Sequence, residues 1–171
     1  MADSILTAER LRETLRYDPE TGVFIRKVRL AQRHHVGDRA DFVVTSGHLK
    51  DYRRVSLFSE RFLAHRLAWL YVHGEWPKQD IDHINGDKGD NRIANLRDVP
   101  NAINRQNMRR ARSDSLTSRY LGVHYHLKGK KWRARIQVNG KCIQVGMFDT
   151  EEAAHAAYVE AKRLVHDGCT I

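Results

Sequence analysis

The 171-residue sequence is poor in cysteine and has no long apolar run. Its 2 cysteines, Cys142 and Cys169, form no CxxC pair and indicate neither a disulfide framework nor a cysteine zinc site, so we interpret both as reduced thiols that fill space. No segment approaches the ~20 apolar residues of a membrane span, and the N-terminus is polar rather than a signal peptide. We therefore expect an intracellular protein with no membrane partner.

Acidic residues are fewer than basic ones. Lys and Arg number 30 against 21 Asp and Glu, which gives a formal net charge of +9, and basic residues gather in segments 105–112 and 128–135. This balance favours a polyanionic partner, although many basic proteins have none. The length allows one ordinary core or two small ones. Charge and length alone therefore do not assign a function, and the sequence motifs are needed to do so.

The first part of the chain predicts short elements of both types. A helix is expected at about Thr7–Leu15, and a strand over Val23–Ile25 follows the turn-rich segment 18–22. Two stretches rich in β-branched and aromatic residues, Phe42–Thr45 and Tyr52–Phe58, predict one or two hairpins. These hairpins either support the core or form an extra DNA-contacting arm. The lack of a dense basic face favours support.

Apolar residues at helical spacing predict a helix over Phe62–Val72 that Gly74 and Pro77 end. We expect this helix to pack into the first core. His65 lies on it, and a histidine in such a place is usually a structural hydrogen-bonding residue. We therefore do not assign catalysis to His65.

The last third predicts three strands, over Leu121–Tyr125, Lys131–Val138 and Lys141–Phe148. Asn139 and Gly140 tolerate positive φ and suit a tight hairpin turn between the last two strands. In the middle strand an apolar face alternates with a cationic face. The apolar residues are Trp132, Ala134, Ile136 and Val138, and the outward ones are Lys131, Arg133, Arg135 and Gln137.

A helix is expected after the third strand. Asp149 or Thr150 can cap it, and Gly168 ends it. Its expected apolar stripe consists of Ala153, Ala157, Tyr158, Ala161 and Leu164. Small alanines let such a helix lie close to the apolar face of the sheet, which leaves the cationic face free.

The most informative part of the sequence resembles the HNH nuclease motif, in the branch typical of phage and intron-encoded homing endonucleases, where the final His is often Asn. The resemblance extends over an ordered set of segments: His65-Arg66-Leu67-Ala68-Trp69, Gly74-Glu75-Trp76-Pro77, Asp82-His83-Ile84-Asn85, Asn91-Arg92-Ile93-Ala94-Asn95-Leu96-Arg97 and Asn101-Ala102-Ile103-Asn104. It implies a ββα-metal nuclease module. A phage or mobile-intron origin, and with it a bacterial cytoplasm, follows from analogy alone.

Hydrolysis of a phosphodiester needs a water made nucleophilic and a cation that neutralises the charge building on the phosphate. His83 suits the first role, because imidazole titrates near neutral pH and accepts the proton of the water. Asp82 suits the second, because hard divalent cations prefer oxygen ligands. The resemblance implies Asn104 as the second ligand, through its amide oxygen. We expect Mg²⁺, with Mn²⁺ or another divalent cation as the alternative.

Asn95 matches the middle residue of the motif. We expect its amide to fix the loop that carries His83, and so to aim the imidazole. The sequence departs from the fuller HNH pattern where Asn104 replaces a metal-binding His and Met108 occupies the next expected His position. A neutral amide oxygen suits Mg²⁺ better than zinc.

The helix expected to begin near Pro100 holds Asn104 and a basic end. Asn101 and Asn107 lie one turn on either side of Asn104, and we interpret them as helix-surface or DNA-facing residues. The basic end is predicted to follow the DNA backbone through Arg105, Arg109, Arg110 and Arg112.

The segment from about Ser118 to Gly168 resembles the plant APETALA-two/ethylene-response-factor DNA-binding domain. The likeness lies in Tyr120-Leu121-Gly122-Val123-His124, Lys131-Trp132-Arg133-Ala134-Arg135-Ile136 and Gly146-Met147-Phe148-Asp149-Thr150-Glu151-Glu152-Ala153-Ala154. In that family a three-stranded sheet lies in the DNA major groove. Leu121, His124 and Gln137 stand where arginines are usual, so the target sequence does not carry over.

Arginine reads guanine or phosphate well, and glutamine can pair with adenine. A merely solvated strand face is the alternative, but four successive outward hydrogen-bond donors opposite an apolar face favour binding. We assign Trp132 to the core rather than to base stacking. DNA contacts are predicted for Arg119, His124, Lys131, Arg133, Arg135, Gln137 and Gln144.

These patterns predict an α+β protein in two domains. Residues 1–112 form the HNH module with its β-hairpins, residues 113–118 a linker, and residues 119–171 a three-stranded antiparallel sheet packed on one helix. We expect a metal-dependent endonuclease that acts on double-stranded DNA as a monomer and nicks one strand, whereas a double-strand break needs a dimer or two events. The alternatives are a non-catalytic DNA-binding or regulatory protein, and an RNA-binding protein, which the lack of an aromatic-rich RNA-recognition pattern disfavours.

Overall fold

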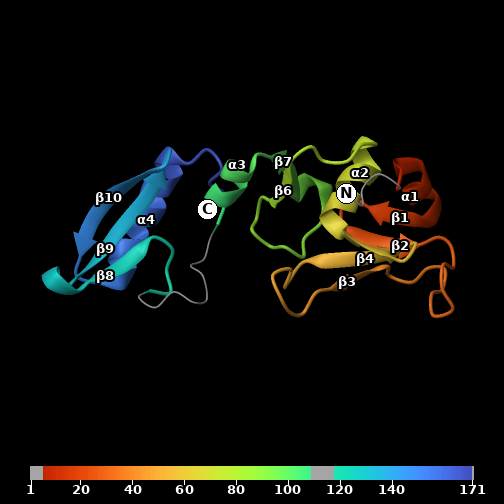
Figure 1. Cartoon of the computed structure of the whole chain (residues 1–171), viewed down its shortest axis with the longest axis horizontal. Helices are drawn as coiled ribbons and strands as arrows, with labels where there is room; N and C mark the ends of the chain where they lie inside the picture. Colours follow the sequence, from red (N-terminus) through yellow and green to blue (C-terminus); the bar gives the residue numbers. More distant parts are fainter. Residues whose placement is uncertain (1–5, 109–117, 171) are drawn as a thin grey trace. The chain divides into compact units, whose positions relative to one another are not determined.

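A computed structural model describes residues 6–108 and 118–170 and divides the chain into two compact units, Met1–Asn101 and Ala102–Ile171 (Figure 1). It is a mixed α/β structure with small sheets and four α-helices in the described residues. The predicted linker, residues 113–118, lies outside the described residues except for Ser118. The predicted domain boundary therefore stays a prediction, and each unit is described by itself.

The first unit begins with helix α1 (Ala8–Thr14) and the antiparallel pair β1 (Leu15–Asp18) and β2 (Val23–Arg26). Thr7 caps the helix, because its hydroxyl accepts a hydrogen bond from Arg10 N at 3.2 Å. The predicted helix and the predicted strand are confirmed. β1 was not predicted, since four residues that begin where a helix ends give little alternation to detect.

A three-stranded antiparallel sheet follows, in the order β3 (Asp41–Val43), β4 (Arg53–Leu57) and β5 (Glu60–Leu63). Helix α2 (Ala64–His73) ends at Gly74, whose φ of 80° suits a left-handed cap. The prediction that this helix begins at Phe62 is wrong by two residues. Phe62 and Leu63 pair with β4 instead, so tertiary strand pairing overrides the helical spacing.

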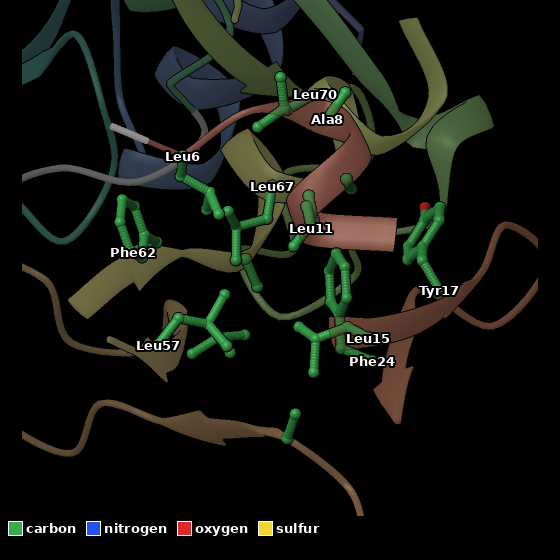
Figure 2. Close-up of a cluster of buried hydrophobic side chains, with 14 of the residues drawn as sticks. Leu6, Ala8, Leu11, Leu15, Tyr17, Phe24, Leu57, Phe62, Leu67 and Leu70 are labelled. Carbon is green, nitrogen blue, oxygen red and sulfur yellow. The ribbon is translucent and has the colours of Figure 1, made fainter. Parts of the chain in front are cut away.

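The core of the first unit joins both sheets to the two helices. Leu11, Leu15 and Phe24 are fully buried, and Figure 2 shows them close to Leu67 from α2 and Leu57 from β4. Burial of side chains of this size stabilises the fold by about 2 kcal/mol each. This core fixes the position of α2, which lies beside the candidate site.

The segment that contains the HNH-like motif forms a strand pair. β6 (Asp80–His83) pairs with β7 (Leu96–Val99) in antiparallel fashion, and the short 3₁₀ helix η1 (Ile93–Asn95) precedes β7. Helix α3 (Asn101–Gln106) comes next in the chain. The chain order is therefore strand, strand, helix, as expected for this motif.

In the second unit, strands β8 (Val123–His126), β9 (Lys131–Val138) and β10 (Lys141–Phe148) form one antiparallel sheet with β9 in the centre. The 3₁₀ helix η2 (Leu127–Gly129) links the first two strands. Asn139 and Gly140 have φ of 49° and 78°, the positive values that a tight hairpin turn requires. The three predicted strands and their turn are confirmed, the last two strands to the residue.

Helix α4 (Glu151–Val165) covers one face of this sheet, and Thr150 caps it through a bond from Ala153 N at 3.1 Å. Its predicted apolar stripe is only partly right. Ala154 and Tyr158 are buried, whereas Ala153 is exposed and Leu164 is 83 % exposed. The predicted stripe includes part of the exposed side of α4, because the many alanines of this helix differ little in polarity from their neighbours. In addition, Lys162 occupies a buried position.

Lys162 ties α4 to the end of α3 inside the second unit. Its ammonium donates to the Met108 carbonyl, and Gly168 N donates to Gln106 Oε1 at 2.9 Å. Asn107 is 5 % exposed and accepts a bond from the Thr170 hydroxyl. The prediction that Asn107 is a surface residue is therefore wrong, because the last residues of the chain cover it.

The two cysteines do not pair with each other, and Cys142 is exposed. The expectation that it fills space is wrong, since its side chain stands on the outer face of the β8–β10 sheet. Among the helices of the described residues, none combines the length and the apolar character needed to cross a bilayer.

Candidate active site

Asp82 and His83 stand at the end of β6, where the strand passes into the loop that leads to η1. Asp82 lies opposite Arg97 of β7, and His83 lies opposite Leu96. Each of the two residues is only 5 % exposed. A carboxylate and an imidazole so enclosed need specific partners, because unpaired polar groups are costly to bury.

The partner of His83 is Asn91. His83 Nε2 lies 3.3 Å from Asn91 Oδ1, and the amide nitrogen of Asn91 donates to the Gly89 carbonyl at 3.4 Å. Since the amide nitrogen faces Gly89, the amide oxygen faces the imidazole, an arrangement that suits the tautomer of His83 with its proton on Nε2. Tyr17 fixes Asn91 in turn, because its hydroxyl donates to the Asn91 carbonyl at 2.7 Å.

The environment keeps His83 neutral. Burial lowers the pKa of its imidazole, while the bond to Asn91 and the nearby carboxylates of Asp82 and Asp87 raise it in part. A neutral imidazole can accept a proton, whereas an imidazolium cannot. The enclosed position of His83 is therefore compatible with a general base at neutral pH.

Asn95 holds the loop after β6 through both ends of its side-chain amide. Its Oδ1 accepts from Asn85 N at 2.9 Å, and its Nδ2 donates to the Asp90 carbonyl at 2.8 Å. The backbone adds a bond from Ile84 N to the Asn95 carbonyl at 2.9 Å. The predicted positioning role requires contacts of this kind, and the role itself stays a prediction.

Three loop residues that were not assigned a role complete this network. Asn85 Nδ2 donates to Asp90 Oδ2 at 2.7 Å, and Asn85 Oδ1 accepts from Asp87 N at 2.8 Å. Asp90 also forms an ion pair with Arg92 at 2.6 Å, and these contacts lower the pKa of its carboxyl. The Asn-Gly-Asp turn was the only signal in the sequence, and such turns are common in surface loops.

Asp82 is held by an arginine of the neighbouring strand. Arg97 Nε lies 2.8 Å and Arg97 Nη2 lies 2.6 Å from Asp82 Oδ2, so two guanidinium nitrogens share one carboxylate oxygen. The register of β6 and β7 places the two residues opposite each other. Arg97 belongs to the motif, but its pairing with Asp82 was not predicted.

Two aromatic rings enclose His83. The ring of His65, from α2, meets it edge to face at 5.0 Å between centroids, and the Tyr52 ring lies at 5.9 Å. Burial lowers the pKa of His65 to about 3, with smaller contributions from His83 and Arg66. Its Nδ1 is enclosed without a hydrogen-bond partner among the described residues. His65 is buried, as expected of a structural histidine, but its Nδ1 makes no hydrogen bond within the described part of the chain.

The other predicted site residues of the motif lie on α3, in the second unit. Asn104 is half-buried and Arg105 is exposed. Asp82 belongs to the first unit, so the predicted pairing of Asp82 and Asn104 around a cation stays a prediction. Among the described residues there is no group of three or more His, Cys, Asp or Glu side chains placed to hold a metal. Arg109, Arg110 and Arg112 lie outside the described residues.

The outer face of the β8–β10 sheet brings together most of the predicted DNA contacts. In the register, His124 is opposite Arg133, Arg135 is opposite Gln144, and Gln137 is opposite Cys142. Residues directly opposite in a ladder point to the same side. Trp132 packs against the inner core as predicted. We call His124, Lys131, Arg133, Arg135, Gln137 and Gln144 the cationic face.

Lys131 on the cationic face and Arg119 near it are paired with acids, whereas one nitrogen of Arg133 is not. Lys131 Nζ lies 2.9 Å from Asp149, and Arg119, outside the sheet, lies 3.2 Å from Glu152. Arg133 Nε has no hydrogen-bond partner among the described residues although it is enclosed. Burial lowers the pKa of His124, and the nearby Arg135 and Arg133 lower it further.

A strand pair with a buried aspartate and histidine, followed along the chain by a helix, is compatible with an HNH nuclease domain. In the comparison with protein families, residues 62–106 match the model described as HNH endonuclease. This segment runs from the end of β5 through α3 and supports an HNH nuclease that cleaves DNA. No curated protein and no solved structure matched the chain.

Proposed function

We propose that this chain is a site-specific, divalent-metal-dependent DNA endonuclease of the homing type, with His83 as the general base. The observation that supports it most strongly is the buried Asp82–His83 pair inside the segment that matches the HNH endonuclease family. Asn91 orients the imidazole, and the loop that Asn95 clamps surrounds it. A surface turn has no need of such a network.

In the proposed reaction, His83 Nδ1 accepts a proton from a water, and the oxygen of that water attacks the phosphorus of the scissile phosphate. The P–O bond to the leaving deoxyribose oxygen breaks, and a proton from solvent neutralises that oxygen. Asn91 stabilises the imidazolium that forms, because Nε2 keeps its proton and its bond to Oδ1. General-base catalysis of this kind contributes about 10² to 10⁴ in rate.

The donor chemistry fits a hard divalent cation. Asp82 offers a carboxylate and Asn104 an amide oxygen, and Mg²⁺ or Mn²⁺ is commonly held by one or two protein groups, with phosphate and water completing the shell. The cation would neutralise charge on the phosphate and the leaving oxygen. Arg97 fixes the position of Asp82, and its own positive charge would help to neutralise the phosphate.

We also propose that the cationic face binds double-stranded DNA in the manner of the ethylene-response-factor domains that the sequence resembles. The face combines arginines and glutamines, the side chains suited to phosphates and base edges, while α4 and the inner core support it from behind. The enclosed and unpartnered Nε of Arg133 supports this role, because a phosphate or base acceptor would complete its hydrogen bonding.

The test is the cleavage of a supercoiled plasmid library, with Mg²⁺ or Mn²⁺ and with a chelator, followed by sequencing of the ends that are produced. We expect cleavage only with a divalent cation, and a rate for His83→Ala lower by about 100-fold or more. His48→Ala is the matched control, because His48 is an exposed histidine of the β3–β4 connection. An open-circle product indicates nicking by a monomer, and a linear product indicates a double-strand break.

Cleavage by His83→Ala at the rate of the unmodified chain would contradict the assignment of the base. Specific binding without cleavage under any divalent cation would instead support the rival proposal, a non-catalytic DNA-binding protein on an HNH-like scaffold. Competition with duplex RNA tests the second rival. We expect DNA to compete and RNA not to.

A further inference from the structure

A second concentration of positive charge lies in the first unit, in a pocket between the β1–β2 hairpin, the segment after β2 and the end of α2. The pocket measures about 450 Å³. Its basic lining residues are Arg16, Arg26 and Lys27, and its apolar walls include Ile25, Val36 and Tyr71. The described lining contains no acidic residue. We call this the Arg26 pocket.

Arg26 is the unusual member of this lining. It is only 6 % exposed, yet its Nη1 is enclosed and has no hydrogen-bond partner among the described residues. Burial lowers the pKa of its guanidinium. A buried charge without a partner is among the costliest arrangements in a fold, so an unfilled donor of this kind points to a ligand.

Two other arginines of the same unit, the exposed Arg39 and the partly buried Arg53, are paired with an acid. Arg39 lies 3.1 Å from the buried carboxylate of Asp41, and Arg53 forms an ion pair with the same group. Asp38, the acid that interacts with Arg26 over a longer range, accepts from His35 N at 2.9 Å and from His35 Nδ1 at 3.3 Å. The fold therefore provides Arg39 and Arg53 with an acid and commits the acid near Arg26 to another residue.

Neighbouring groups strengthen the preference for an anion. His34 has an enclosed Nδ1 without a partner in the described residues, and burial and Arg26 both lower its pKa. Lys27 Nζ donates to the Arg12 carbonyl at 2.6 Å, which holds its ammonium in one orientation. Arg16 is exposed at the rim. Arg16, Arg26 and Lys27 thus line one opening, and His34 lies close enough to Arg26 to feel its charge.

We propose that the Arg26 pocket binds a phosphate group of the DNA backbone, as a contact separate from the cationic face and from His83. The inference rests on the proposed DNA-cleaving function, which provides the polyanion. A guanidinium pairs with phosphate oxygens through two parallel hydrogen bonds, and Arg16 and Lys27 add charge at the entrance. The β1–β2 hairpin then has a contact with DNA besides its place in the core.

The experiment measures binding of the full chain to a duplex in EDTA, over a range of salt concentrations. Arg26→Met removes the charge and keeps the length of the side chain. Arg61→Met is the matched control, because Arg61 is exposed on β5 and its loss changes the net charge equally. We expect Arg26→Met to bind roughly tenfold more weakly and to lower the slope of log affinity against log salt by about one. Arg61→Met should keep the slope.

Two further arms distinguish the possible failures. Because Arg26→Met could alter folding, Arg16→Met tests the same pocket from its exposed rim and should also lower the slope. Thermal unfolding in inorganic phosphate, against chloride at equal ionic strength, tests a free anion. A phosphate effect that Arg26→Met abolishes while DNA binding is unchanged would assign the pocket to a free phosphate and overturn the inference.

An unchanged affinity and slope for both pocket variants would also overturn it. If the unmodified chain binds and cleaves DNA, that result excludes only the pocket as a DNA contact and does not affect the proposed function. If the unmodified chain binds no DNA at all, the proposed function fails together with the inference.

Discussion

The loop around His83 and the cationic face of the second unit contain similar polar residues, but those of the loop are bonded to one another and to nearby backbone. In the loop, Asn85, Asp90, Asn91 and Asn95 bond to one another or to nearby backbone, so their geometry is set before any ligand arrives. On the cationic face, Gln137 and Gln144 are exposed, and Arg133 Nε has no partner in the described residues. Chemistry needs groups that are already oriented, whereas recognition needs groups whose partners come from the DNA.

After the loss of the general base itself, the largest effect is expected from Asn95→Ala. Both ends of its amide are used, so the variant leaves Asn85 N and the Asp90 carbonyl without their partner. We expect the cleavage rate to fall about 100-fold and the free energy of unfolding to fall by about 3 kcal/mol. Single-turnover cleavage and urea unfolding measure the two effects.

Asn95→Asp keeps the acceptor for Asn85 N, but it turns an oxygen toward the Asp90 carbonyl and adds a buried negative charge. We therefore expect it to lose cleavage and stability as well, since only the neutral amide serves both contacts. Equal activity of all three proteins would remove Asn95 from the positioning of the site.

The next effect concerns the support of the cationic face. Gly122 has a φ of 74°, and a Cβ there would lie 2.2 Å from the Tyr158 ring and 2.8 Å from the Arg135 carbonyl. Gly122→Ala should therefore lower the free energy of unfolding by about 3 kcal/mol. Gly140→Ala is the control, since Gly140 has a similar φ of 78° but nothing within 4 Å, and it should cost only about 1 kcal/mol. Similar costs for the two variants would contradict the packing described for Tyr158.

Arg135→Ala separates recognition from chemistry. It removes a central cation opposite Gln144, so affinity for the specific site should fall roughly tenfold while the rate on saturating DNA stays nearly unchanged. Arg163→Ala, on the exposed side of α4, removes the same charge and should change affinity less. Binding and single-turnover rates on one substrate measure both. An affinity for Arg135→Ala equal to that of the unmodified chain would exclude this face from the interface.

The smallest expected effect is a dependence of stability on pH that arises from His65. The pKa of His65 is about 3 in the fold, below its ordinary 6.5. The unfolded chain therefore binds more protons between these values, so stability falls as pH drops below 6.5. From pH 7 to pH 5 we expect a loss on the order of 1 kcal/mol. His65→Phe should lack this part of the loss in urea titrations, and an unchanged pH dependence would contradict a neutral, buried His65.

Long regular patterns were predictable from the sequence. β9 alternates between apolar and polar residues and is joined to β10 by an Asn-Gly turn, so the bounds of these two eight-residue strands were found to the residue. β1 has only four residues, and the phase of α4 was wrong because a buried lysine replaced an apolar residue. Periodicity is informative only when the side chains differ enough in polarity.

The candidate site was predictable where the residue type itself implies the chemistry. Asp82, His83 and Asn95 follow from the motif, and the structure places the first two together at the end of β6. Asn91 and Arg97 were missed as partners, because their roles depend on a loop path and on a strand register that no local spacing encodes. The Arg26 pocket was missed for the same reason, since its arginine sits in a strand that looks like ordinary core.

A crystal structure of the chain with uncleaved target DNA and a divalent cation tests the central claim most directly. The account predicts that His83 Nδ1 lies within hydrogen-bond distance of a water next to one phosphate, that Nε2 still contacts Asn91, and that the cation lies on Asp82. An imidazole turned away from every phosphate, with no ion beside Asp82, would contradict it.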